Sequence, residues 1–183
     1  MNIIDIVILG ILQGITEFLP VSSSGHLVLA QYMLGIESPG NTLEILFHIG
    51  TLFSVIYVFN KDIKSIVMSL NEKPTQKLVI YIIIATIPAV IIGLIFKSHI
   101  INLFSSIVPV GYALLSTGAI LTLSINFKNK NKSLSYLYSL LIGLAQAVAI
   151  IPGISRSGTT ISISMLLGIP PKEAARFSFL LSI

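Results

Sequence analysis

The chain has 183 residues, of which 54% are hydrophobic and 10% are charged, and its formal net charge is +4. Soluble domains carry about 25% charged residues, so this composition excludes an ordinary water-soluble protein. The positive charge does not indicate a nucleic-acid partner, because the lysines lie in short connections between apolar segments. Lysines placed in this way are typical of the cytoplasmic loops of membrane proteins. The chain contains no cysteine, so disulfide bonds give no information about its compartment.

The first apolar element is interrupted near its middle. Residues 2–19 and 24–36 are apolar, but the segment between them reads Leu19-Pro-Val-Ser-Ser-Ser-Gly25. Proline and glycine break helices, and each half is short for a hydrocarbon core of about 30 Å. The sequence therefore predicts a re-entrant hairpin of two half-helices, with the broken backbone buried in protein or lining a wet cavity.

Three longer apolar segments follow, and we expect residues 42–60, 78–96 and 106–126 to cross the membrane. The connections between these segments differ in charge. The first and third connections carry clustered lysines, which are Lys61, Lys64, Lys73 and Lys77, and then Lys128, Lys130 and Lys132. The second connection has Lys97 alone. By the positive-inside rule, residues 61–77 and 127–133 lie in the cytoplasm and residues 97–105 lie outside.

A second broken element repeats the first. Residues 134–151 and 159–169 are separated by Pro152-Gly-Ile-Ser-Arg-Ser-Gly158, and a shift of 133 positions aligns this element with residues 10–36. The eight identities are Gly10/Gly143, Gln13/Gln146, Ser22/Ser155, Ser24/Ser157, Gly25/Gly158 and Leu34-Gly35-Ile36/Leu167-Gly168-Ile169. Three crossings between the copies place them in opposite orientations, and inverted repeats of this kind form their site where the broken helices meet.

The predicted fold is therefore an all-α polytopic membrane bundle with two inverted repeats, each holding a re-entrant broken-helix hairpin. We expect one membrane domain over residues 1–183, with repeat 1 at about 2–60 and repeat 2 at about 134–183. Repeat 2 lacks the crossings that follow repeat 1. Either the chain is part of a longer protein, or another chain supplies helices, for which a homo-oligomer is one arrangement.

The first break carries candidate catalytic residues. Gln13 and Glu17 are four apart and share a helix face. A carboxylate at membrane depth costs about 2.5–3.5 kcal/mol on insertion scales, so Glu17 is a candidate functional residue. A structural alternative is that Glu17 pairs with Arg156 or caps the second hairpin. His26 lies close enough in sequence to Ser23 to act as an acid or base.

The residues Ser22, Ser23, Ser24 and Gly25 allow two compatible interpretations. Serines before a helix accept hydrogen bonds from its first N–H groups. A glycine-containing turn at a helix N-terminus also offers backbone donors and a positive dipole end to an anion. One serine can cap the helix while another faces a ligand.

The second break reads Ser155-Arg156-Ser157-Gly158-Thr159-Thr160, and the planar donor fork of Arg156 suits phosphate oxygens. The run lacks the G-x-x-x-x-G-K-[ST] pattern of a nucleotide-binding P-loop. It also differs from the arginine-led acid phosphatase motif, which requires a histidine where this chain has Ser162. Glu44 and His48 either extend the site or line its mouth. A carboxylate, a histidine and hydroxyls facing an arginine predict a site for a phosphate ester with a metal, on a lipid substrate.

These residues closely resemble the undecaprenyl-diphosphatase family, also called bacitracin resistance proteins. The resemblance runs from about residue 8 to the end of the chain. It rests on Gln13-x-x-x-Glu17-Phe-Leu-Pro-Val-Ser-Ser-Ser-Gly-His26, on Pro152-Gly-x-Ser-Arg-Ser-Gly158, and on Phe177-Ser-Phe-Leu-Leu-Ser. Gln13 departs from the glutamate that many members carry, which leaves a cation one anionic ligand fewer.

The resemblance implies hydrolysis of undecaprenyl pyrophosphate to undecaprenyl phosphate and inorganic phosphate. This reaction recycles the carrier lipid of cell-wall (peptidoglycan) synthesis and confers bacitracin resistance. It also implies a multi-pass protein of the bacterial inner membrane, with its active site open to the outside and a divalent cation, Mg²⁺ or Ca²⁺, as cofactor.

The family motifs also suggest roles for individual residues. Glu17 would bind the metal or act as acid or base, Ser23 is the candidate nucleophile, His26 its acid/base partner, and Arg156 the clamp on the pyrophosphate. The remaining substrate-binding candidates are Gln13, Ser22, Ser24, Gly25, Ser155, Ser157, Gly158 and Thr160. Whether Ser23 or a water attacks stays open.

A transporter or flippase of a polyprenyl phosphate is the alternative function. Inverted repeats with broken helices are typical of transporters, so the architecture alone does not decide. The Ser-Ser-Ser-Gly-His cluster at residues 22–26 favours the enzyme.

Overall fold

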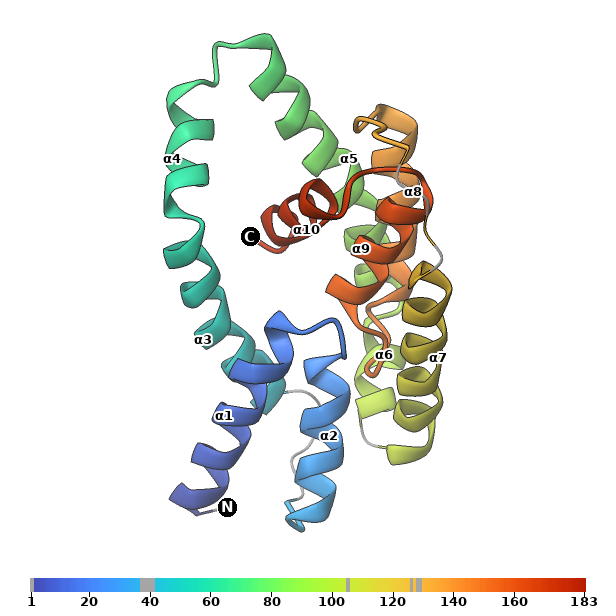
Figure 1. Cartoon of the computed structure of the whole chain (residues 1–183). Helices are drawn as coiled ribbons and strands as arrows, with labels where there is room; N and C mark the ends of the chain where they lie inside the picture. The colour runs from blue at the N-terminus through green and yellow to red at the C-terminus, as the bar shows by residue number, and fades with distance from the viewer. Residues whose placement is uncertain (1, 37–41, 105, 126, 128–129) are drawn as a thin grey trace.

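The computed structural model describes residues 2–36, 42–104, 106–125, 127 and 130–183, and within these ranges every regular element is a helix (Figure 1). The ten helices are α1 Ile3–Phe18, α2 Ser23–Met33, α3 Thr42–Val58, α4 Asn60–Met68, α5 Lys73–Ile95, α6 Lys97–Phe104, α7 Ile107–Ile125, α8 Tyr136–Val148, α9 Arg156–Leu166 and α10 Pro171–Leu180. The predicted all-α class is confirmed.

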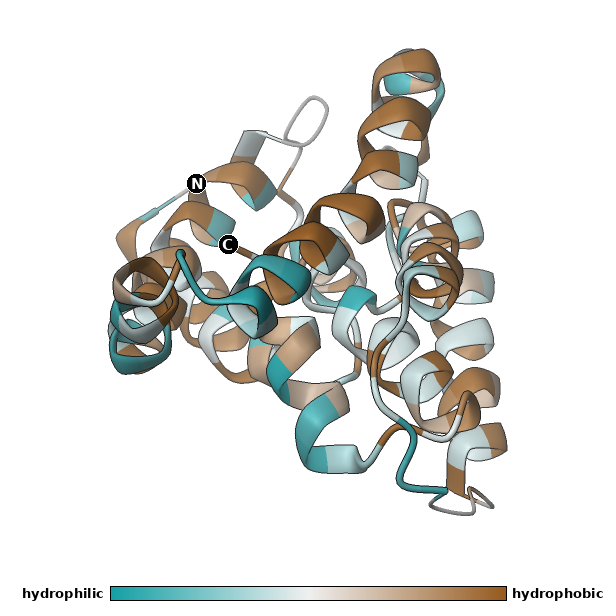
Figure 2. Ribbon diagram, turned by 90° about the horizontal axis from the view of Figure 1, so that it is seen from above, coloured by the Kyte–Doolittle hydropathy of each residue, from teal (hydrophilic) through white to brown (hydrophobic). Residues whose placement is uncertain are grey.

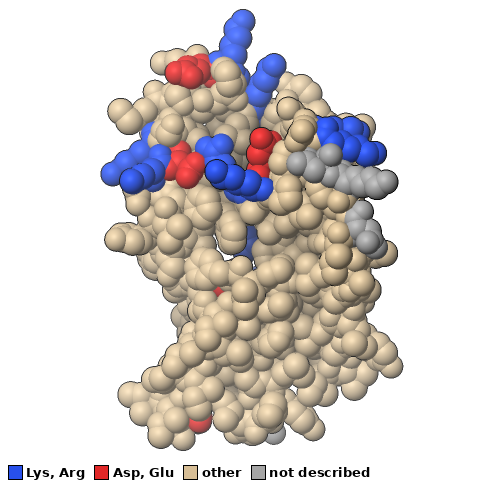
Figure 3. Space-filling model, in the orientation of Figure 1, with Lys and Arg blue, Asp and Glu red and all other residues tan. Residues whose placement is uncertain are grey.

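Two of these helices, α5 and α7, are long and apolar enough to cross a membrane. Only 11% of the most apolar window of α5 and 22% of that of α7 is buried inside the protein. The rest of these apolar surfaces faces outward, where hydrocarbon rather than water is the compatible solvent. Figure 2 shows apolar residues along most turns of the outer helices, and Figure 3 shows that charged side chains gather toward one end. The chain is a membrane protein.

The expected crossing at 42–60 is not one straight helix. It consists of α3 and the start of α4, which meet at a 65° bend and form a third candidate span only if they count together. The expected connection 61–77 contains most of α4 and the start of α5, and the expected connection 97–105 contains α6. Lysine is a good helix former, so lysine-rich connections can coil into helices that the charge pattern alone does not reveal. Lys128, one of the lysines in the third connection, lies outside the described residues.

Each broken element is a pair of neighbouring helices, α1 with α2 and α8 with α9 (Figure 1). The second helix of each pair has the same length and the same limits after the shift of 133 positions, Ser23–Met33 and Arg156–Leu166. Both end at a glycine with positive φ, +66° at Gly35 and +101° at Gly168, which is the left-handed conformation that glycine adopts without steric cost. The repeat in the sequence is thus a repeat of local structure.

The two breaks approach each other closely. A Cβ atom on Gly25 would lie 2.8 Å from the Cα of Gly153 in the second break. A Cβ atom on Gly158 would lie 2.7 Å from the carbonyl oxygen of Pro20 in the first break. Each break therefore uses a glycine to admit the backbone of the other. Helix α7 packs against both α2 and α9 and joins the two pairs.

Helices α5 and α8 form the most extensive helix contact in the described chain. They approach closely because Gly143 faces Ala85, where a Cβ atom would lie 2.5 Å from the carbonyl oxygen. An apolar core continues from this contact to α10 through Ala85, Ile142, Ile169, Ala174, Phe177 and Leu181. This core positions α9, which begins at the second break.

Candidate active site

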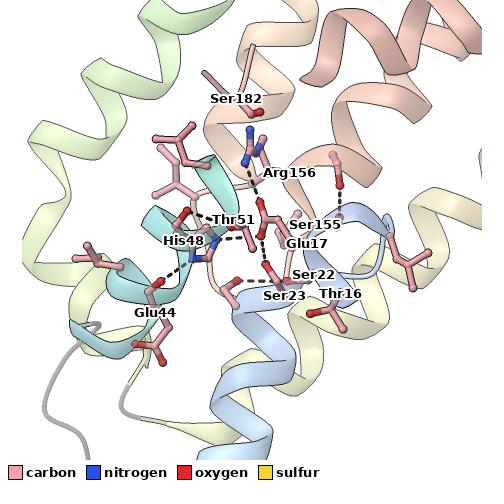
Figure 4. A pocket seen from close by; sticks show the side chains of 18 of the residues that line it. Thr16, Glu17, Ser22, Ser23, Glu44, His48, Thr51, Ser155, Arg156 and Ser182 are labelled. Atoms are coloured by element: carbon pink, nitrogen blue, oxygen red, sulfur yellow. Dashed lines mark hydrogen bonds and ion pairs between the residues drawn. The ribbon is translucent and has the colours of Figure 1, made fainter. Parts of the chain in front are cut away.

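A cavity of about 460 Å³ lies between α3 and the two breaks (Figure 4). Its polar lining consists of Thr16, Glu17, Ser22, Ser23, Ser24, Glu44, His48, Thr51, Ser155, Arg156, Ser157 and Ser182. Its apolar lining consists of Leu19, Ile45, Ile49, Leu52, Val55, Phe104, Ala149, Ile150 and Ile154. The cavity therefore combines polar side chains from both breaks and α3 with apolar side chains such as Ile45, Ile49 and Leu52 of α3, which matches a ligand with a polar head and a hydrocarbon chain.

Glu17 lies at the centre of the polar lining. Its Oε2 atom accepts hydrogen bonds from Ser23 Oγ at 2.5 Å and from Gln13 Nε2 at 3.0 Å, and it lies 3.3 Å from His48 Nε2. Its Oε1 atom accepts from Arg156 Nη2 at 3.1 Å. One carboxylate thus joins the first break, α3 and the second break.

The Glu17–Arg156 ion pair is largely buried, with side-chain exposures of 12% and 31%. Removing one partner of such a pair leaves an uncompensated charge, which costs about 3–5 kcal/mol. The pair therefore links the two broken elements electrostatically. Arg156 also lines the cavity, where guanidinium N–H donors suit the oxygens of a phosphate.

The N-termini of α2 and α9 both open into the cavity, and their caps are built in the same way. Ser22 Oγ accepts from the Gly25 N–H at 3.3 Å, and Ser155 Oγ accepts from the Gly158 N–H at 3.0 Å. The free N–H groups of a first helical turn and the positive dipole end favour an anion. Two such ends in one cavity suit a ligand with two phosphate groups.

Thr117 of α7 supports the second break, and the sequence analysis did not identify it. Its hydroxyl donates to the Gly153 carbonyl at 2.8 Å and accepts from the Ser155 N–H at 2.9 Å. Both backbone groups would otherwise be unpaired, which is costly in a buried segment. A hydroxyl inside an apolar helix was the available signal, but its partner depends on how α7 packs.

The structure brings seven of the predicted site residues to the cavity wall: Glu17, Ser22, Ser23, Ser24, Ser155, Arg156 and Ser157. Five others are not among the described residues that line the cavity: Gln13, Gly25, His26, Gly158 and Thr160. Gln13 is only 1% exposed and reaches the site through Glu17. Thr160 is fully buried and donates to the Arg156 carbonyl at 2.9 Å, so it supports the backbone beneath the guanidinium.

The two histidines near the breaks occupy different places. His26 Nδ1 donates to the Ser22 carbonyl at 2.8 Å, and His26 is not among the described residues that line the cavity. His48 lines the cavity and contacts Glu17. The predicted role of His26 as partner of Ser23 stays a prediction. Glu44 and His48, left open by the sequence, both line the cavity, and Thr51 and Ser182 join it without having been predicted.

The donors at the site fit a cation that is shared with a substrate better than one held by protein alone. Within the described ranges, no three His, Cys, Asp or Glu side chains form a metal-binding group. Glu17 offers a carboxylate, and the buried Gln13 Oε1 atom has no hydrogen-bond partner. Mg²⁺ commonly binds through one or two carboxylates together with substrate phosphates and water, so Glu17, a carboxylate of the cavity wall, fits a cation that a phosphate ligand completes.

The fold and the cavity define the class of the protein, an α-helical membrane protein with a cavity lined by polar side chains between two helix breaks. The family model described as "Bacitracin resistance protein BacA" matches residues 6–183. The chain belongs to this family, which confirms the resemblance seen in the sequence.

Relatives with curated names agree with this assignment. The "Undecaprenyl-diphosphatase" of Halothermothrix orenii is 49% identical over 185 residues, covering 100% of this chain and 71% of the relative. Proteins of the same name from Desulforapulum autotrophicum and Christiangramia forsetii are each 46% identical, over 96% and 99% of this chain and 71% of each relative.

Proposed function

We infer that this chain is an undecaprenyl-diphosphate phosphatase. It is a membrane hydrolase that converts undecaprenyl pyrophosphate to undecaprenyl phosphate and inorganic phosphate, and it thereby recycles the carrier lipid of cell-wall synthesis and confers bacitracin resistance. One structural observation carries the assignment most directly. Arg156 of one broken element meets Glu17 and Ser23 of the other inside a single cavity.

We propose that the two phosphates bind between the N-termini of α2 and α9, with Arg156 as the clamp. The serine hydroxyls and backbone N–H groups of residues 22–25 and 155–158 would supply the other donors. The first isoprene units would lie along the apolar wall formed by Ile45, Ile49 and Leu52 of α3. This orientation places the pyrophosphate against Ser23 and Glu17.

Glu17 is positioned to receive a proton, because Ser23 Oγ donates to its Oε2 atom at 2.5 Å. If Ser23 attacks, an Oγ–P bond forms as the anhydride P–O bond breaks, undecaprenyl phosphate leaves, and water later hydrolyses the phosphoserine. If water attacks, the same carboxylate takes its proton and inorganic phosphate forms in one step. Trapping of a phosphoserine at residue 23 would distinguish the two routes.

We propose that Glu17 holds a divalent cation, Mg²⁺ or Ca²⁺, together with substrate oxygens. Such a cation neutralises negative charge on the phosphates during phosphoryl transfer. Arg156 contributes a fixed positive charge to the same phosphates. Loss of phosphate release on chelation, and its return when one of the two ions is added back, would support this cofactor.

We propose that the two broken elements are re-entrant hairpins of an inverted repeat within one membrane domain. The equal limits of α2 and α9 and the matched caps support the repeat. The lysine-rich connections would face the cytoplasm, and the site would open to the outside of a bacterial inner membrane.

The absence of native cysteine makes the orientation testable by labelling single cysteines. Cysteines at Lys64 and Lys130 should react with an impermeant maleimide only from the cytoplasmic side of vesicles. Labelling of either position from the opposite side would contradict the proposed orientation. The homo-oligomer that we kept as one alternative is tested by the mass of the purified protein in detergent.

The function is tested by measuring phosphate release from undecaprenyl pyrophosphate by the purified full chain, with chromatography of the lipid product. Arg156→Ala should abolish release. Arg176→Ala is the matched control, because Arg176 is an exposed arginine paired with Asp62 on the surface and should keep activity. Movement of a polyprenyl phosphate across proteoliposomes without any phosphate release would instead favour the transporter.

A further inference from the structure

We propose that His48 is a positioning residue for Glu17, and that it fixes the carboxylate which serves Ser23. This inference rests on the proposed phosphatase function for its kinetic consequence, but its geometry does not depend on that function. His48 comes from α3, which belongs to neither broken element. It therefore gives Glu17 a contact that is independent of the two elements that bind the phosphates.

The imidazole of His48 is held from both sides. Its Nδ1 atom lies 2.7 Å from the Glu44 carbonyl oxygen, and since a carbonyl oxygen can only accept, Nδ1 is the donor. Its Nε2 atom is thereby directed at Glu17 Oε2, 3.3 Å away. Because the proton of a neutral ring is already on Nδ1, Nε2 donates to the Glu17 carboxylate only as part of an imidazolium cation, and the contact is then an ion pair.

Glu44, whose carbonyl oxygen accepts from His48, is itself held by a hydrogen bond from Gln31. The Glu44 side chain is 4% exposed, and its Oε1 atom accepts from Gln31 Nε2 of α2 at 2.6 Å. In Figure 4 the Glu44 carboxylate points away from the His48 ring, so the carboxylate and the carbonyl have different partners. The resulting path runs from Gln31 through Glu44, His48 and Glu17 to Ser23, and so returns to α2.

This path matters because a glutamate carboxylate has a soft terminal torsion, and its own rotamer preference does not fix the plane of the oxygens. Two of its partners, Ser23 and Arg156, are the groups that engage the phosphates in the proposed reaction. A third partner, Gln13, is on the same helix as Glu17 and moves with it. His48 is the contact from α3, and it keeps Oε2 directed at Ser23 when Arg156 turns toward a phosphate.

The kinetic test compares His48→Ala and His48→Gln with His99→Ala in the purified full chain. His99 is an exposed histidine on α6 whose ring lies edge-on to Phe96, so it controls for loss of an imidazole. A displacement of about 1 Å in a reacting group can cost about 100-fold in rate. We expect His48→Ala to lower kcat by about 10–100-fold with KM changed by less than about twofold, because Arg156 and the N-termini of α2 and α9, rather than His48, bind the phosphates in the proposed complex.

Two further observations separate positioning from general destabilisation. Added imidazole should restore part of the kcat of His48→Ala, and His48→Gln should retain more activity than His48→Ala because a side-chain amide has N–H groups that could donate to Oε2. A histidine that only fills space would be replaced as well by His48→Leu as by His48→Gln, because the two side chains have similar volumes, so equal rates of these two variants would also overturn the proposal. A kcat of His48→Ala equal to that of His99→Ala would overturn the proposal.

A measurement without turnover keeps the proposal independent of the phosphatase assignment. The side-chain nitrogens of ¹⁵N-histidine-labelled protein are compared by NMR between the wild-type chain and Glu17→Gln. The His48 Nε2 resonance should shift, whereas those of His99 should not. An unchanged His48 resonance would overturn the positioning role even in an active enzyme. A shifted resonance in a wild-type chain that releases no phosphate would support the contact and refute the proposed function.

Discussion

Ser22 in the first broken element and Ser155 in the second lie 133 positions apart, and each accepts a hydrogen bond from the N–H of the glycine three residues later. The positions that support the backbone are thus the same in both elements. Two positions that face the cavity differ between them. Glu17 corresponds to Ile150 and Ser23 corresponds to Arg156. Two copies of one backbone therefore supply different chemical groups, an acceptor and a hydroxyl from the first and a cation from the second.

Packing also differs between the copies. Gly25 and Gly158 each admit the backbone of the opposite break. By contrast, Gly143 is pressed against the Ala85 carbonyl, whereas a Cβ atom on Gly10 would meet only the ring of Phe47, at 3.5 Å. Both broken elements have a glycine at this position, but only at Gly143 does the packing leave no room for a side chain.

The largest expected effect comes from removing the carboxylate of Glu17, which is present in the first broken element and absent from the second. Glu17→Ala should lower kcat/KM by about 1,000-fold or more, because the proton acceptor for Ser23 and the partner of Arg156 are lost together. The matched change, Ile150→Val, should leave phosphate release near the wild-type rate. A Glu17→Ala rate within tenfold of wild type would contradict the catalytic role of the carboxylate that distinguishes the first broken element from the second.

The glycines that align at Gly10 and Gly143 provide the next test, measured as unfolding free energy in detergent. Gly143→Ala should destabilise the fold by about 3 kcal/mol, because its Cβ would lie 2.5 Å from the Ala85 carbonyl oxygen on a rigid helix. Gly10→Ala should be neutral or stabilise by up to about 1 kcal/mol, since alanine is the better helix former. Equal effects at the two positions would contradict the packing difference.

The reciprocal glycines should behave alike. Gly25→Ala and Gly158→Ala should each cost about 2 kcal/mol of unfolding free energy, because each Cβ would meet backbone atoms within 2.8 Å. Each should also lower phosphate release, since the breaks would separate and carry Ser23 and Arg156 apart. If one of the two substitutions left both stability and activity unchanged, the reciprocal contact would be wrong at that position.

The smallest expected effect concerns the two capping serines. Ser155→Gly should cost a few tenths of a kcal/mol through the lost cap. Ser22 has a φ of +70°, a region in which glycine is unstrained, so Ser22→Gly should cost less than Ser155→Gly or should stabilise slightly. Thermal unfolding of the two variants, measured side by side, decides this. A larger loss of stability for Ser22→Gly than for Ser155→Gly would contradict the backbone strain inferred at Ser22.

The breaks, the repeat and the meeting of Glu17 with Arg156 could be predicted from the sequence because they rest on local chemistry. Proline, glycine and serine fix where a helix stops, and a buried arginine requires an anion. That His48 lines the cavity and contacts Glu17 could not be predicted, since it depends on how α3 packs beside α1. The helices α4 and α6 were also missed, because lysine content reports the side of the membrane and not the backbone conformation.

The central claim is that each broken element supplies half of one catalytic site. A double-mutant cycle on phosphate release from undecaprenyl pyrophosphate tests it most directly, with Glu17→Asp, Arg156→Lys and the double variant, conservative changes chosen to keep activity measurable. If the residues act on one reacting group, the loss in the double variant should be smaller than the product of the single losses, with a coupling energy of about 1–3 kcal/mol. Losses that multiply, or a wild-type rate in either single variant, would contradict the account.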